Sequence, residues 1–202
     1  MRDGSLKSAS LGLSELAAVV HPSRLAARLD PALSAATLVR LQKSPRLQAR
    51  LAGLLLDDED DLDGDSWRQD LLLGHDPRRA ALLAGSIWHA RSLVKLVSKP
   101  DLSLLVGRIG AEAHAFGIRH LGHAIATESI ADPEQLAQQI EHEGHACLGA
   151  WLEESSALDR KRVLLRLPIG TAADDPAIEH RGVAGRLFSL VVACLATEMP
   201  EI

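Results

Sequence analysis

GHACLGAWLEESSALDRKRVLLRLP, residues 144–168, is the stretch from which the fold prediction starts. It joins an apolar helical segment that carries Trp151 to a basic patch, Arg160 to Arg162. A Leu/Arg run then follows and ends at Pro168. The run before Pro168 fits the end of a helix or a short strand, and we favour the helix.

The segment that leads into this stretch predicts one long helix over residues 133–153. Leu136, Ile140, Cys147 and Trp151 lie along one stripe at helical spacing, which is typical of a helix that buries one face. Gly144 lies on the same stripe. Because glycine has no side chain, we expect a neighbouring backbone to approach the helix closely there.

Composition favours helices over the rest of the chain as well. Hydrophobic residues make up 47% of the 202 residues, but aromatic residues only 2%, so Leu, Ala, Val and Ile must fill the core. Leu and Ala are strong helix formers, whereas residues that favour strands are few. We therefore predict an all-α fold: a single compact domain of about nine to eleven helices over residues 11–202. A small N-terminal lobe over residues 11–56 is the alternative organisation.

Proline marks several helix starts. A proline follows each of four capping residues, Asp30, Ser44, Asp76 and Asp132. The Asp or Ser side chain can accept hydrogen bonds from the free amides of the first helical turn. Proline at the first helical position has no amide hydrogen that would be left unpaired. Residues 1–10 are small and polar, and we expect them to be flexible. The predicted helices span residues 13–20, 23–29, 31–42, 45–56, 66–73, 77–97, 101–109, 111–127, 133–153, 157–167 and 182–197.

Charge and cysteine content restrict the cellular setting. A net charge of −5 gives no general reason to bind nucleic acid or an anionic membrane. Cys147 and Cys194 lack CxxC spacing and fit buried thiols of a reducing compartment. The N-terminus resembles no signal peptide, and the apolar run at 187–196 is too short to span a bilayer. These features predict a cytoplasmic protein.

Residues 57–65, DDEDDLDGD, form an acidic loop that is similar to a calcium-binding EF-hand loop. An EF-hand register places acidic residues at loop positions 1, 3, 5 and 12 and a glycine at position 6. The register departs from the motif because Glu59 stands first, Asp70 stands last and Ser66 replaces an apolar residue. A solvated loop and a docking surface for a basic partner are the other interpretations.

Histidine pairs raise the question of a metal site. His120 and His123 are three residues apart, as are His142 and His145, which puts each pair on one helix face. The second pair is one residue too short for the HExxH metalloprotease motif. No GxSxG nucleophile motif and no P-loop occur either. These patterns predict no catalytic residue, no metal and no cofactor.

Three parts of the chain together resemble the SctK family: the segment Cys147–Leu152, the segment Arg160–Pro168, and a Leu/Val-rich terminal helix ending at Met199-Pro200. SctK proteins, also called YscK or PscK, are the K subunits of type III secretion systems. The resemblance covers about the C-terminal two thirds of the chain, from residue 72 to residue 200. Its signature residues, which we expect to be structural, are Trp151, Leu152, Leu165, Arg166, Leu167 and Pro168.

The resemblance implies an α-helical, non-catalytic adaptor of the cytoplasmic sorting platform. Such an adaptor connects the cytoplasmic domain of the inner-membrane ring protein SctD to the pod protein SctQ, and hence to SctL and the ATPase SctN. It would lie at the cytoplasmic face of the inner membrane without inserting into it, and would bind no nucleic acid. Charged exposed segments steer encounters with partners, so we expect partner contacts at Asp57, Asp58, Asp60, Asp61, Asp63, Arg160, Lys161 and Arg162.

Two other functions remain as alternatives. One is a helical metal-dependent enzyme that uses a set of five histidines, His114, His120, His123, His142 and His145. The other is an unrelated helical regulatory domain that acts through protein contacts.

Overall fold

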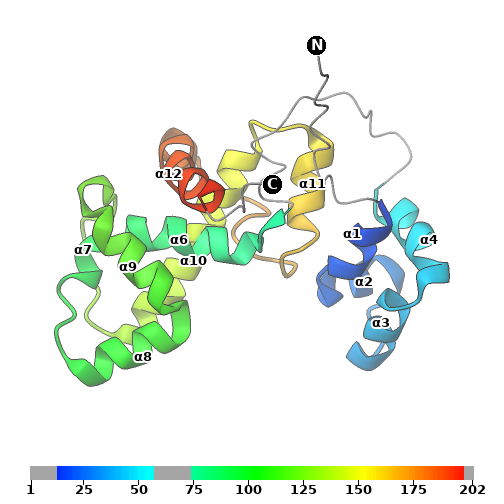
Figure 1. Ribbon diagram of the computed structural model, residues 1–202, viewed down its shortest axis with the longest axis horizontal. Helices are drawn as coiled ribbons and strands as arrows, with labels where there is room; N and C mark the ends of the chain where they lie inside the picture. The colour runs from blue at the N-terminus through cyan, green and yellow to red at the C-terminus, as the bar shows by residue number, and fades with distance from the viewer. Residues whose placement is uncertain (1–12, 57–73, 198–202) are drawn as a thin grey trace, which may run out of the picture. The chain divides into compact units, whose positions relative to one another are not determined.

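The computed structural model describes residues 13–56 and 74–197 (Figure 1). Within these two ranges the secondary structure is helical and contains no strand, which confirms the all-α prediction. The predicted flexible N-terminus 1–10, the acidic loop 57–65 and the helix expected at 66–73 lie outside the described residues.

The first helices are α1 (Leu13–Val19), α2 (Pro22–Leu29), α3 (Ala35–Gln42) and α4 (Pro45–Leu55). After the gap come α6 (Pro77–Trp88), α7 (Ala90–Leu93), α8 (Lys99–Ile109), α9 (Ala111–Arg119) and the 3-10 turn η1 (Leu121–His123). The chain continues with α10 (Pro133–Leu152), α11 (Ala157–Leu164) and α12 (Ile178–Ala196).

The described residues divide into two compact units. Unit 1 combines α1 to α4 with α11, which follows α4 by about a hundred residues of chain, and unit 2 contains the other helices. The sequence suggested a lobe of consecutive residues, 11–56, but unit 1 also takes in residues 156–168. Its core is aliphatic and consists of Leu16, Ala17, Val20, Leu25, Leu38, Leu51, Leu55, Leu56 and Leu158.

Side-chain caps form at two of the four predicted positions, whereas Ser44 precedes α4 without a capping hydrogen bond from its side chain. Asp76 and Asp132 accept hydrogen bonds from amides in the first turns of α6 and α10. The helix predicted after Asp30 begins later, at Ala35, because Ser34 caps it by accepting from the Thr37 amide. His21 performs the same task for α2, since its Nδ1 accepts from the Ser23 amide at 3.3 Å.

Unit 2 is organised around the packing of α10 on α6, with α8 and α12 also in contact with α10. At the crossing, Gly85 of α6 and Gly144 of α10 lie against the partner helix's backbone. A Cβ at Gly85 would overlap the Ile140 carbonyl, and a Cβ at Gly144 would overlap the Ala81 carbonyl. The close approach predicted at Gly144 is therefore confirmed.

Two predicted helices end earlier than expected, and one tertiary interaction accounts for the first of these ends. The helix expected at 77–97 ends at Trp88, and the helix expected at 111–127 ends at Arg119. The Trp88 carbonyl accepts from the amides of Ile125 and Ala126, at 3.2 and 3.0 Å. In a continuous helix, the Ser92 amide would donate to the Trp88 carbonyl. Because a distant segment binds that carbonyl, the Ser92 amide donates to the His89 carbonyl instead.

None of the helices in the described ranges is both long enough and apolar enough to cross a bilayer.

Candidate functional site

The basic patch Arg160–Arg162 lies on α11, one turn after the Ser156 cap. All three side chains are partly buried. They are therefore less exposed than the docking surface that the sequence predicted. Arg162 is paired with Asp159 at 3.8 Å, and their side chains are only 17% and 8% exposed. Partner binding by this patch stays a prediction.

The signature residues are divided between the two units. Trp151 and Leu152 are buried in unit 2, where the Trp151 ring stacks on Phe188 of α12 with centroids 4.9 Å apart. Leu165 and Leu167 belong to unit 1, where Leu165 packs against the core and Leu167 is fully buried. The stretch therefore contributes to two cores instead of one.

The end of this stretch is held by the start of α2 through hydrogen bonds to its main-chain carbonyls. The His21 amide donates to the Leu165 carbonyl at 2.8 Å. Arg24 donates from Nε to the Leu167 carbonyl and from Nη2 to the Pro168 carbonyl, both at 3.1 Å. These donors satisfy carbonyls that follow α11 and that no further helical turn would satisfy. The Leu-Arg-Leu-Pro run is thus a helix end and a turn, and the strand alternative is excluded.

A buried polar cluster connects three helices of unit 2. His180 of α12 lies 2.5 Å from Glu143 of α10, atom Nε2 to Oε2, and its side chain is 3% exposed. The Trp88 ring of α6 stacks on the His180 ring at 4.9 Å. His89, which follows Trp88 in the chain, is 5% exposed. Neither of its ring nitrogens has a hydrogen-bond partner among the described residues.

Burial shifts the pKa values of groups in and near this cluster. It lowers the pKa of His89, although the Glu143 carboxylate opposes the shift. It also lowers the pKa of His145, a buried residue of α10. Burial, with the nearby carboxylate, raises the pKa of the Cys147 thiol. A thiol with a raised pKa remains protonated and is a poor nucleophile, which agrees with the predicted packing role.

The histidines weighed as metal ligands do not converge. The His120 and His123 rings are 6.2 Å apart at the end of α9, whereas His142 is exposed on α10 and His145 is buried. Across the described ranges, no three His, Cys, Asp or Glu side chains are grouped to hold a metal ion. The calcium register over residues 59–70 lies in the gap between those ranges.

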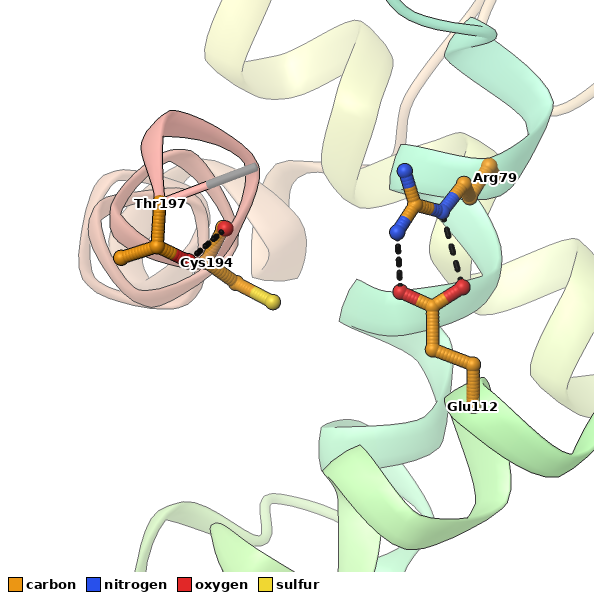
Figure 2. Close-up of polar contacts among 4 residues, drawn as sticks. All are labelled: Arg79, Glu112, Cys194 and Thr197. Carbon is orange, nitrogen blue, oxygen red and sulfur yellow. Dashed lines mark hydrogen bonds and ion pairs between the residues drawn. The ribbon is translucent and has the colours of Figure 1, made fainter. Parts of the chain in front are cut away.

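An open cavity of about 410 Å³ lies where α6, α8 and α9 meet. Arg79 closes one side by a two-pronged ion pair with Glu112, its Nε 2.8 Å from Oε2 and its Nη2 bound to Oε1 (Figure 2). Figure 2 also shows the last turn of α12, where the Thr197 hydroxyl donates to the Cys194 carbonyl at 2.6 Å. Arg108 borders the cavity on the α8 side.

Sequence reasoning missed the residues that connect helices at a distance. Neither His180 nor Arg24 was selected, because each stands alone in the sequence and belongs to no motif. Their partners lie 37 and more than 140 residues away along the chain. No local pattern reports contacts of that separation. The acidic residues Asp57, Asp58, Asp60, Asp61 and Asp63 lie outside the described residues.

Comparison with known proteins yields two close relatives. Over 198 residues the chain is 67% identical to the nodulation protein NolU of Sinorhizobium fredii strain NBRC 101917 / NGR234. The match covers 98% of this chain and 93% of that protein. The nodulation protein NolU of Rhizobium fredii matches with the same identity and coverage. No protein-family model matches the chain, and no solved structure does.

Proposed function

The chain belongs to the family of the nodulation protein NolU, and on that premise we propose that it is a non-catalytic adaptor of a type III secretion system. The observation that carries the proposal is the 67% identity over 98% of the chain. A protein named for nodulation acts where a bacterium meets its plant host, and type III secretion operates at such contacts. The resemblance of residues 147–168 to SctK proteins supports the same setting.

Within that system we assign the chain to the sorting platform. There it joins the cytoplasmic domain of an SctD-like ring protein to an SctQ-like pod protein, and through it to SctL and the ATPase SctN. An adaptor needs two binding surfaces, and two compact units with separate cores are well suited to supply them.

The experiment is copurification of the full chain with each neighbour. The tagged chain is expressed with the SctD-like cytoplasmic domain or with the SctQ-like protein, and we expect both to be retained. Failure of the intact chain to retain either neighbour would contradict the adaptor role. In cells, deletion of the gene should stop secretion, and the wild-type gene should restore it.

A charge-reversal variant tests the predicted acidic docking segment. D60K/D61K/D63K is expected to lose at least one of the two neighbours, because an acidic segment attracts a basic partner surface. The matched control, E128K/E154K/E179K, changes the net charge equally at exposed positions and should retain both. Equal retention by the two variants would remove the segment from the interface.

A further inference from the structure

Charge in unit 2 is distributed unevenly. Residues 90–99 and 118–127 contain four Lys or Arg residues and no Asp or Glu, although the whole chain carries a net charge of −5. The cations are Arg91, Lys95, Lys99 and Arg119, and all four are exposed. The net charge of the whole chain averages over this segregation and does not describe the local field.

The fold brings the two segments to the same end of unit 2. Helix α7 packs on α9, as Figure 1 shows, and the contact is so close that a Cβ at Gly117 would overlap the Leu93 side chain. Arg91 adds a hydrogen bond from Nη1 to the Ala126 carbonyl at 3.2 Å. The cations of both segments therefore contribute to one positive field.

Apolar side chains are exposed among these cations. Val97, in the turn between α7 and α8, is 89% exposed and is flanked by Lys95 and Lys99. Val94 is 42% exposed, and on the α9 side Ile118 and Leu121 are each 39% exposed. We call these four residues and the four cations the basic apolar end.

We propose that the basic apolar end binds an anionic phospholipid surface, with the lysines on the headgroup phosphates and Val97 at the depth of the acyl boundary. Lys and Arg near an anionic leaflet are attracted to it, and exposed apolar side chains between them add burial in the interface. The contact is peripheral, in keeping with the absence of a spanning helix among the described residues. It does not depend on the proposed adaptor role.

The same features favour lipid over an acidic protein surface. Residues that dominate protein interfaces are enriched in Trp, Tyr and Arg. The two segments contain Arg91 and Arg119 but no Trp, Tyr or Phe, so they lack the aromatic anchors of such an interface. The nearby aromatic residues, Trp88 and Phe116, are buried. Asp101 and Glu128 lie two residues and one residue beyond the segments, and they offset part of the positive charge towards either kind of partner. A highly exposed valine between lysines matches a fluid interface better than a fitted protein pocket.

The experiment is sedimentation of the full chain with vesicles of phosphatidylcholine alone or with 40 mole per cent phosphatidylglycerol. We expect binding to the anionic vesicles, little binding to the neutral ones, and weakening of the binding as salt rises. K95E/K99E should weaken binding on the order of 30-fold or more, since each cation contributes about a fivefold factor. V97S should weaken it about threefold without changing the salt dependence.

The control variant R40E/R50E carries the same net charge as K95E/K99E but changes exposed residues of α3 and α4. It should bind like the wild type, and circular dichroism with urea unfolding should show all variants folded. Absence of binding to the anionic vesicles, or an equal loss in both charge variants, would overturn the proposal. Binding to polyglutamate but not to vesicles would overturn it in favour of an acidic protein partner.

Discussion

Two glycines set the distance between the main helices of unit 2. Gly85 and Gly144 face each other's helix at the crossing of α6 and α10, and neither has room for a Cβ because a backbone carbonyl occupies that position. A backbone atom cannot rotate away as a side chain can. The two helices would therefore have to separate along their contact.

We predict that Gly144→Ala lowers the free energy of unfolding by about 2–3 kcal/mol, the cost of overpacking a rigid contact. Gly185→Ala is the matched control, because a Cβ there meets nothing within 4 Å on α12. It should raise stability by about 0.5–1 kcal/mol through helix propensity. Urea unfolding measures both, and equal effects in the two variants would contradict the crossing.

Buried histidines make stability depend on pH. Burial lowers the pKa of His89 and His145 below the ordinary value of 6.5, which the unfolded chain keeps. As pH falls through 6.5, the unfolded state takes up protons first. Stability contributed by these groups is thus present above pH 6.5 and is lost below it, at no more than about 1.4 kcal/mol per pH unit for each histidine.

We predict that His89→Met makes this loss shallower and does not lower stability at pH 7.5. The variant removes a titrating group and two buried ring nitrogens that lack partners among the described residues. Urea midpoints at pH 7.5, 6.5 and 5.5 measure the slope. A slope unchanged from the wild type would show that His89 is not a source of acid sensitivity.

At the scale of elements, α10 and α12 are joined by two hydrogen-bonded side-chain pairs of different burial. Glu143–His180 is almost enclosed, with side chains 17% and 3% exposed. Glu153–Arg181 joins the C-terminal end of α10 to the first turn of α12, with side chains 25% and 51% exposed. Water screens the second pair, whereas removing one partner of the first leaves a buried polar group unsatisfied.

We predict that Glu143→Ala costs about 2 kcal/mol of stability, since it leaves Nε2 of the buried His180 without its hydrogen-bond partner. Glu153→Ala, which breaks the exposed pair between the same helices, should cost much less. Thermal or urea unfolding of the two variants gives the comparison, and equal costs would contradict the distinction between the pairs. Added salt should narrow the gap between wild type and Glu153→Ala only.

At the scale of the molecule, unit 1 is discontinuous in sequence. Leu158 of α11 belongs to the same core as Leu16, Leu25 and Leu38, so the segment 156–168 completes a unit begun by α1 to α4. Arg24 and His21 reinforce this closure through the carbonyls that follow α11. Each unit has its own core, which lets one be perturbed separately.

We predict that Leu25→Ala, a truncation of a side chain that is 1% exposed, destabilises unit 1 by about 2–5 kcal/mol. Amide hydrogen exchange should then accelerate in α1 to α4 and in the distant α11, while α6 and α10 keep their protection. Leu148→Ala, at a fully buried position of α10, is the converse control. Uniform acceleration across both units would contradict two separate cores.

The sequence by itself determined the all-helical class and most helix positions, because these follow from local preferences. The helix propensity of Leu and Ala and the caps at Asp76 and Asp132 depend only on residues close together in the chain. The same is true of the apolar spacing that places Gly144 on one face of its helix. The comparison of whole sequences likewise placed the chain in the NolU family. Local rules did not predict the structure where a segment distant in the sequence binds a polar group of a helix.

Only the tertiary structure decided those cases. The Trp88 carbonyl accepts hydrogen bonds from Ile125 and Ala126, so α6 ends at Trp88. Glu143 bonds to His180, which lies 37 residues away along the chain. The opening stretch, residues 144–168, is divided between two cores although it reads as one signature. Which groups meet depends on packing energies summed over the whole chain, and a local pattern contains no record of that sum.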